Sequence, residues 1–210
     1  MSTLVLQNTV WLEKDGTRIM RGLRKRDSGL LDRLIELYQH RLLRYLYYLT
    51  GNRELAEDIF QETWMRVLER GHQYNGKSRF DTWLFAIARH LVIDNSRKKS
   101  AVSLEAMTEP QDGRIPIEFA TTETSPFDRA IRSQTAGRLS QALMHLEDVQ
   151  REVIVLRFQE EMSLDEIAEV TEAPLSTVKS RLYRGLEALK PVIGQPQEFQ
   201  MQSTIREGRN

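Results

Sequence analysis

The chain has 210 residues, and its 30 basic and 30 acidic side chains give a formal net charge of zero. This balance argues against a basic coat for nonspecific nucleic-acid binding, and the absence of cysteine excludes disulfides and thiolate zinc sites. No apolar run is long enough to cross a bilayer and no signal-peptide pattern opens the chain, so we expect a cytoplasmic protein without membrane insertion. The length is best met by two small domains.

Residues 1–29 give the weakest structural signal. Leu4 to Leu12 is compatible with a strand, and a basic cluster follows. The cluster consists of Arg21, Arg24, Lys25 and Arg26. Neither feature assigns a role to this N-terminal extension.

Residues 30–99 have helical periodicity almost throughout. Gly51 is expected to end a first helix, and Asn52 is expected to cap a second one that runs to Gly71. The apolar side of this second helix comprises Leu55, Ile59, Phe60, Trp64, Val67 and Leu68. These signals predict a helical bundle.

A loop and a third helix complete this segment. Asn75-Gly76 is a strong turn dipeptide, which places a loop before the helix. Asp81 is expected to cap that helix, with Arg89, His90, Ile93 and Arg97 facing outward. The helix is expected to end in the basic run Arg97-Lys98-Lys99.

Residues 100–128 change character abruptly. Four helix breakers, Pro110, Gly113, Pro116 and Pro126, punctuate a polar and acidic run. We expect an extended, flexible acidic linker.

A second helical block covers residues 129–190. Ser163 and Glu166 have the spacing of a capping box that opens a helix. Pro174 places a break before it and a new helix from about Leu175. This is the pattern of a helix-turn-helix, followed by a polar tail over 191–210.

The last helix has two different faces. Its apolar positions are Val178, Leu182, Leu186 and Leu189. Its polar positions are Ser176, Thr177, Ser180 and Arg184, flanked by Lys179 and Arg181. Hydroxyls and cations on a short helix suit the DNA major groove, although an ordinary helix hairpin with a solvated basic face would have the same pattern. Gly185 is unexpected inside such a helix, since Ala would favour it by up to about 1 kcal/mol.

Three motifs at the right separation resemble the sigma factors of bacterial RNA polymerase. They are Asp58-Ile59-Phe60-Gln61-Glu62-Thr63-Trp64, Phe80-Asp81-Thr82-Trp83-Leu84 leading into Ile87-Ala88-Arg89, and Thr177-Val178-Lys179-Ser180-Arg181-Leu182. The best resemblance is to the small extracytoplasmic-function (ECF) group. It implies an all-α fold with two small helical domains, region 2 over 30–99 and region 4 over 129–190, joined by the linker.

The resemblance implies a polymerase-docking face on the second helix. The residues that match it are Asp58, Gln61, Glu62 and Met65. Asp58, Gln61 and Glu62 share one side of a helix by their i, i+3, i+4 spacing and could meet a basic partner. A solvated helix face beside a Trp64 core would look the same in the sequence.

The resemblance also implies that the loop and the third helix recognise and melt the −10 promoter element, partly by capturing a flipped base. The implied residues are Tyr74, Asn75, Lys77, Ser78, Phe80, Trp83, Arg89, His90, Arg97, Lys98 and Lys99. Stacking on aromatic rings can offset the cost of flipping. Phe80 and Trp83 fit a core role equally well.

For the −35 element, the resemblance implies a second set of residues. It consists of Ser176, Thr177, Lys179, Ser180, Arg181 and Arg184. The implied partners are core RNA polymerase, promoter DNA and an anti-sigma factor. No cofactor or metal is expected, because His40, His72, His90 and His145 lack metal-ligand spacing.

We therefore expect a sigma factor that directs promoter-specific initiation while polymerase performs the chemistry. A free-standing helix-turn-helix regulator is the alternative, and it predicts a ligand pocket or phospho-acceptor site in residues 30–99. A helical enzyme acting on nucleic acid fits less well, since no phosphate loop and no paired nucleophile and base are evident.

Overall fold

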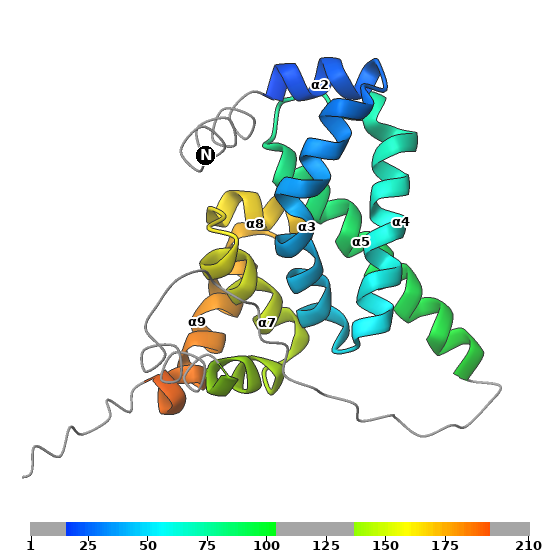
Figure 1. Ribbon diagram of the computed structural model, residues 1–210. Coiled ribbons are helices and arrows are strands. Elements are labelled where there is room, and N and C mark those ends of the chain that lie inside the picture. The colour runs from blue at the N-terminus through cyan, green and yellow to red at the C-terminus, as the bar shows by residue number, and fades with distance from the viewer. Residues whose placement is uncertain (1–15, 104–136, 194–210) are drawn as a thin grey trace, which may run out of the picture.

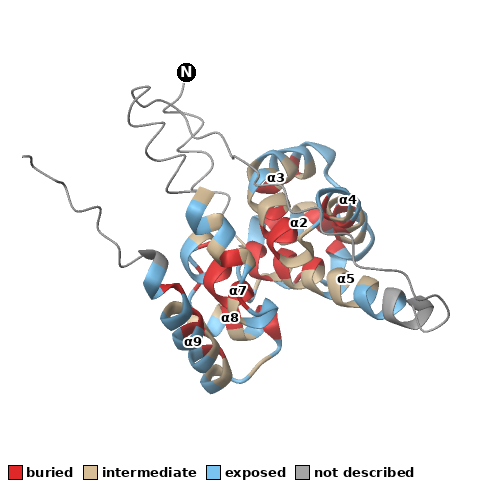
Figure 2. Cartoon of the chain, turned by 90° about the horizontal axis from the view of Figure 1, so that it is seen from below, coloured by how far each residue is buried: buried red, intermediate tan, exposed pale blue. Residues whose placement is uncertain are grey.

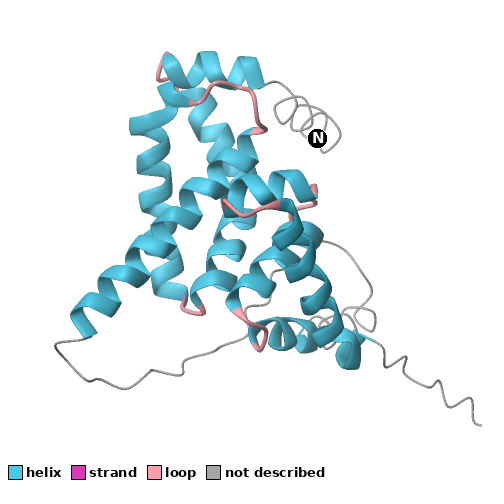
Figure 3. Cartoon of the chain, turned by 180° about the vertical axis from the view of Figure 1, so that it is seen from behind, coloured by secondary structure: helices cyan, strands magenta, loops and turns pink. Residues whose placement is uncertain are grey.

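Helices form all the regular structure in residues 16–103 and 137–193, which are the parts of the chain that the computed structural model describes (Figures 1 and 3). Three segments lie outside these residues: Leu4 to Leu12, for which the sequence allowed a strand, nearly all of the acidic linker, and most of the C-terminal tail. The expected all-α fold is confirmed for the described parts.

The first helical unit contains four α-helices and one short 3-10 turn. They are α2 (Gly16–Arg24), α3 (Ser28–Thr50), α4 (Arg53–Arg70), η1 (Gly71–Gln73) and α5 (Phe80–Ser103). Helices α3, α4 and α5 pack against one another. The α2 helix lies across the end of this bundle where α4 ends, in a segment for which the sequence predicted no helix (Figure 1).

Local capping sets the boundaries between α3 and α4. Gly51 ends α3 in the left-handed region with φ +63°, and its N–H donates to the carbonyl of Tyr47. The side chain of Asn52 accepts a hydrogen bond from the N–H of Leu55 at 2.9 Å and so opens α4. Both predicted caps are confirmed.

The predicted cap at Asp81 is wrong. The α5 helix already begins at Phe80, and Asp81 lies buried in its first turn. Its carboxylate accepts from the N–H of Thr82 at 2.9 Å and pairs with Arg79 at 2.6 Å. Asp81 therefore neutralises arginines, including Arg41 of α3 at 3.4 Å, rather than capping the helix.

The second helical unit contains the helix-turn-helix. Its elements are a helix over 137–144, α7 (Asp148–Ile154), the π-helical segment η2 (Val155–Gln159), α8 (Leu164–Thr171) and α9 (Leu175–Ile193). The capping box of Ser163 and Glu166 is confirmed, with both reciprocal hydrogen bonds present. Glu172 takes the left-handed conformation at φ 49° that a glycine would usually supply at the end of α8.

Two features of α9 differ from the sequence prediction. The helix continues through Pro191 to Ile193, beyond the expected end at Lys190. Gly185 is buried, and a Cβ there would lie 2.5 Å from the Cδ1 of Ile154 in α7. The glycine that seemed out of place therefore allows α9 and α7 to pack closely.

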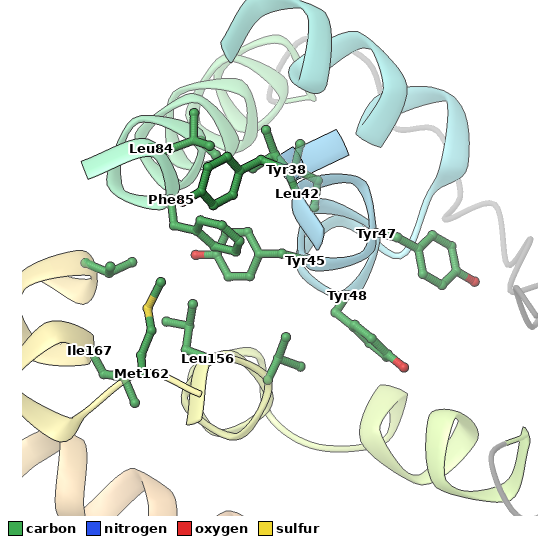
Figure 4. Packing of buried hydrophobic residues seen from close by; sticks show 14 of the residues in the cluster. Tyr38, Leu42, Tyr45, Tyr47, Tyr48, Leu84, Phe85, Leu156, Met162 and Ile167 are labelled. Atoms are coloured by element: carbon green, nitrogen blue, oxygen red, sulfur yellow. The ribbon is translucent and has the colours of Figure 1, made fainter. Parts of the chain in front are cut away.

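The two units share one core. The rings of Tyr45 in α3 and Phe85 in α5 pack at a tilt, with their centroids 4.8 Å apart. They face Leu156, Met162 and Ile167 of the second unit (Figure 4). Helix α5 packs along α8, and Figure 2 shows the buried residues on the helix faces turned toward this contact, whereas much of α9 and the far end of α5 stay exposed.

We predict that Gly185→Ala destabilises the protein by roughly 1–3 kcal/mol, because the added methyl group must displace Ile154. Urea unfolding followed by circular dichroism measures this change. Gly137→Ala is the matched control, because a Cβ at Gly137 meets nothing within 4 Å. Equal stability of Gly185→Ala and the parent protein would contradict the close-packing argument.

Candidate polymerase and nucleic-acid interface

A buried carboxylate joins the two helical units. The side chain of Glu160, at the end of η2, is 0 % exposed. It accepts from Arg41 Nε and from Arg44 Nη2, both on α3, at 2.8 Å. Burial alone would lower the pKa of Arg41, but the attraction of Glu160 and Asp81 outweighs it and raises that pKa. Two cations on one helix thus hold an anion of the other unit.

A second buried carboxylate crosses the same contact. Glu152 of α7 accepts from Arg89 of α5 at 2.9 Å and from the hydroxyl of Tyr45 at 3.0 Å. Burial raises the pKa of Glu152, while Arg89 and Tyr45 oppose that shift. Burial and the nearby Glu152 also raise the pKa of Tyr45, so its phenol stays protonated and donates.

Two more exposed polar pairs lie near the buried carboxylates of Glu160 and Glu152. His90 of α5 lies 3.0 Å from the carboxylate of Glu172, and Arg79 lies 3.5 Å from that of Glu166. Both carboxylates belong to α8 or its end. The α5 helix therefore faces the helix-turn-helix along its N-terminal half.

This contact engages part of the set implied for the −10 element. Arg89 was expected to face outward, but its side chain is only 15 % exposed because it pairs with Glu152. His90 is exposed yet paired. Arg97 and Lys98 are exposed near the other end of α5, and the side chain of Lys99 lies outside the described residues. The basic residues of α5 are thus divided between an internal contact and solvent.

The aromatic residues before and within α5 belong to the core. Tyr74 and Phe80 are buried, and their rings meet edge to face at a centroid distance of 5.6 Å. Trp83 is half-buried and packs on both rings, and Tyr38 of α3 completes the cluster. Burial raises the pKa of Tyr74 to about 12. Of the two roles left open for Phe80 and Trp83, the core role is the one seen.

The loop between η1 and α5 presents three polar side chains. Asn75 and Lys77 are exposed and Ser78 is half-buried. The side-chain oxygen of Asn75 accepts from the N–H of Lys77 at 2.9 Å, and the hydroxyl of Tyr74 donates to the carbonyl of Ser78 at 2.8 Å. These two bonds and the left-handed Gly76 give the loop a defined shape.

The face of α4 that matches the docking motif is open. Asp58, Gln61 and Met65 are exposed, and Glu62 is partly exposed and pairs with Arg66 at 2.8 Å. Leu68, which the sequence assigned to the apolar side of this helix, is 51 % exposed and follows Met65 by one helical turn. An acidic end and an apolar end therefore share this helix surface, and exposure of Leu68 could not be read from the helical period.

The polar face of α9 is also open. Ser176, Lys179, Ser180 and Arg184 are exposed and Thr177 is half-buried. The opposite face buries Val178, Leu182 and Leu189 against the rest of the unit, as the periodicity predicted. Tyr183 adds an exposed aromatic ring beside Arg184 that the sequence prediction omitted.

Arg181 differs from its neighbours on α9. It is half-buried, and its Nη1 is buried without a hydrogen-bond partner among the described residues. Its charge lowers the pKa of Glu152, so the two side chains attract each other. Arg181 lines an open groove of about 300 Å³ together with Glu147, which precedes α7, and with residues at the start of α9. This residue stabilises the inner carboxylate while it borders the exposed surface.

The described residues contain no cluster of His, Cys, Asp and Glu that could hold a metal ion. Nor is any helix in those residues both long and apolar enough to cross a membrane.

Comparison with known proteins identifies both helical units. Residues 34–102 match the family Sigma-70 region 2, and residues 136–189 match Sigma-70, region 4. The ECF RNA polymerase sigma factor SigW of Bacillus subtilis is 32% identical over 170 residues, which are 80% of this chain and 91% of that protein. BldN of Streptomyces coelicolor, also an ECF sigma factor, is 33% identical over 186 residues, which are 85% of this chain and 68% of BldN.

Solved structures share the fold. The sigma factor RpoE from Bartonella quintana, crystallised with the anti-sigma factor NepR, has a TM-score of 0.63 at 21% identity, covering 78% of this chain and 96% of that one. CnrH, solved with the cytosolic domain of CnrY, has a TM-score of 0.60 at 18% identity, covering 87% and 97%. With the two region matches and the relatives above, the chain belongs to the ECF group of RNA polymerase sigma factors.

Proposed function

We propose that this sigma factor, which directs promoter-specific initiation with core RNA polymerase, divides the work among three of its surfaces. The α4 face docks on polymerase, the loop before α5 with the basic end of α5 engages the −10 element, and the polar face of α9 engages the −35 element. Polymerase performs the chemistry, and the protein itself catalyses nothing. The observation that carries this assignment is that α9 buries one face while its hydroxyl and cationic side chains remain open.

The chemistry of each surface supports its role. A helix presenting Ser176, Lys179 and Arg184 can contact phosphates and base edges in a major groove. The exposed Asn75 amide can donate to and accept from the edge of a flipped base. Asp58 and Gln61 beside the apolar Met65 give α4 the mixed character of a protein-docking surface.

We further propose that region 2 comprises residues 30–99, that region 4 comprises 129–190, and that the segment 100–128 links them as an acidic tether. The protein acts in the cytoplasm, where polymerase and DNA are found. An anti-sigma protein is proposed as a further partner, since the solved RpoE and CnrH structures each contain a bound second protein and RpoE's partner NepR is named an anti-sigma factor.

The contact between the two helical units must open before the whole −10 set can meet DNA. Arg89 and His90 belong to the −10 set, yet both pair with carboxylates of the second unit. DNA phosphates can replace Glu152 and Glu172 as partners of these cations. Initiation therefore exchanges an internal set of ion pairs for contacts with promoter DNA.

For docking, we predict that Asp58→Lys weakens binding to core polymerase about tenfold or more, because it reverses a charge at the proposed interface. Fluorescence titration of labelled protein with core polymerase measures the dissociation constant. Asp32→Lys is the control, since Asp32 is an exposed aspartate on α3, outside the proposed face. If both variants weaken binding equally, or if neither weakens it, this part of α4 does not dock on polymerase.

For the −35 element, we predict that Arg184→Ala costs about 1–3 kcal/mol of promoter binding by the holoenzyme. The effect should vanish on a promoter whose −35 element is replaced, because the lost contact is to that element. Run-off transcription on the two templates measures it, with Lys190→Ala near the far end of α9 as the control. An equal loss on both templates would assign Arg184 to general phosphate binding or to folding.

If the contact between the two helical units must open, a cross-link between α5 and the end of α8 should abolish initiation, and we predict this result. The chain has no cysteine, so His90→Cys with Glu172→Cys provides two unique thiols at a pair that lies in contact. A reducible thiol cross-linker should block run-off transcription, and reduction should restore it to the level of the untreated double variant. Full activity of the cross-linked protein would show that the contact need not open.

A further inference from the structure

Helix α2 lies along the loop that precedes α5 (Figure 1). It buries Ile19 and Leu23, and Leu23 packs directly on η1, where the loop begins. A Cβ added at Gly71 of η1 would lie 3.1 Å from the Cβ of Leu23, so helix and turn are in close contact. This anchors one end of α2 beside the loop, although α2 lies outside the part of the chain that matches Sigma-70 region 2.

The other end of α2 meets the loop backbone to backbone. A Cβ at Gly16 would lie 3.1 Å from the carbonyl oxygen of Gly76 and 3.1 Å from the hydroxyl of Tyr74. In return, a Cβ at Gly76 would lie 3.2 Å from the carbonyl oxygen of Gly16. Such distances are shorter than most real Cβ contacts, and Gly76 also has φ +72°, which favours glycine. Two facing glycines therefore set how near the loop lies to α2.

This approach fixes the direction of the exposed side chains in the loop. Gly76 lies between Asn75 and Lys77, so any displacement of its carbonyl moves both neighbours. The hydroxyl of Tyr74, which touches the same Gly16 position, holds the carbonyl of Ser78 at 2.8 Å. A shift of a few tenths of an ångström at Gly16 is thus passed to both ends of the polar segment 75–78.

We propose that α2 positions the base-reading loop and that Gly16 is a positioning residue for selectivity at the −10 element. This inference rests on the proposed function of the loop. Recognition of a flipped base by hydrogen bonds needs donors and acceptors held within a few tenths of an ångström. Helix α2 provides this support from outside the loop.

The test compares Gly16→Ala with its matched control Gly29→Ala in reconstituted holoenzyme. Gly29 is the second residue of α3, and an added Cβ there would lie 3.6 Å from Asp27 Oδ1, so the same substitution meets only an ordinary van der Waals contact. Run-off transcription is measured on a set of promoters that carry each base at every −10 position. A second template series with the −35 element replaced, thermal unfolding and core binding serve as further readouts.

We expect Gly16→Ala to reduce the preference for the best base by about fivefold or more at one or two −10 positions, as for the loss of a specific base contact. Dependence on the −35 element and core binding should stay unchanged. Thermal stability should change little, because the substitution leaves the buried contacts of Ile19 and Leu23 in place. A purely structural role for Gly16 would lower stability and −35-dependent activity together, and that result would overturn the inference.

Asn75→Ala separates the inference from the function beneath it. If this variant keeps the full −10 preference of the parent holoenzyme, the loop does not read the element, and both the loop function and the inference fail. If Asn75→Ala loses preference while Gly16→Ala retains it, the loop function stands and the positioning role of α2 is refuted. Loss of preference in both variants, with Gly29→Ala unchanged, supports the inference.

Discussion

A carboxylate is costly to bury unless cations accompany it, and Glu160 of the second helical unit is fully buried between Arg41 and Arg44 of the first. Removing either side of this contact leaves an uncompensated charge, so the pairing makes the arrangement of the units specific. Glu152 adds a second buried anion held by Arg89 and Tyr45. The apolar core shared by Tyr45, Phe85 and the residues of η2 and α8 completes this contact between the units (Figure 4).

These ion pairs also decide which surfaces are open. The same helix, α5, carries Arg89 toward Glu152 and Arg97 toward solvent, so its basic side chains are divided between the contact and the surface. The exposed side chains of α4 and α9 lie outside these ion pairs, whereas the half-buried Arg181 of α9 attracts Glu152. In the proposed function, the closed arrangement lets the exposed α4 face meet polymerase first, and DNA phosphates then compete for Arg89 and His90.

Much of the fold could be predicted from local sequence signals. The Ser163–Glu166 box, the Gly51 and Asn52 caps and the break at Pro174 each depend on a few adjacent residues, and the structure confirms them. Features that depend on distant partners could not be predicted. The need for glycine at position 185 comes from its close contact with Ile154 of another helix. Arg89 turns inward because Glu152 lies across the contact, and Asp81 pairs with arginines instead of capping a helix. The α2 helix was missed because it is short, although Ile19 and Leu23 at i, i+4 spacing signal an apolar helix face.

In the proposed function, the contact between the two helical units opens when the protein engages polymerase and a promoter. Spin labels on Asp32→Cys in α3 and Glu187→Cys in α9, both exposed positions of a cysteine-free chain, report the distance between the units by pulsed electron resonance. The account predicts one narrow distance in the free protein and a longer one in the promoter complex. An unchanged narrow distance in a complex that initiates transcription would contradict it.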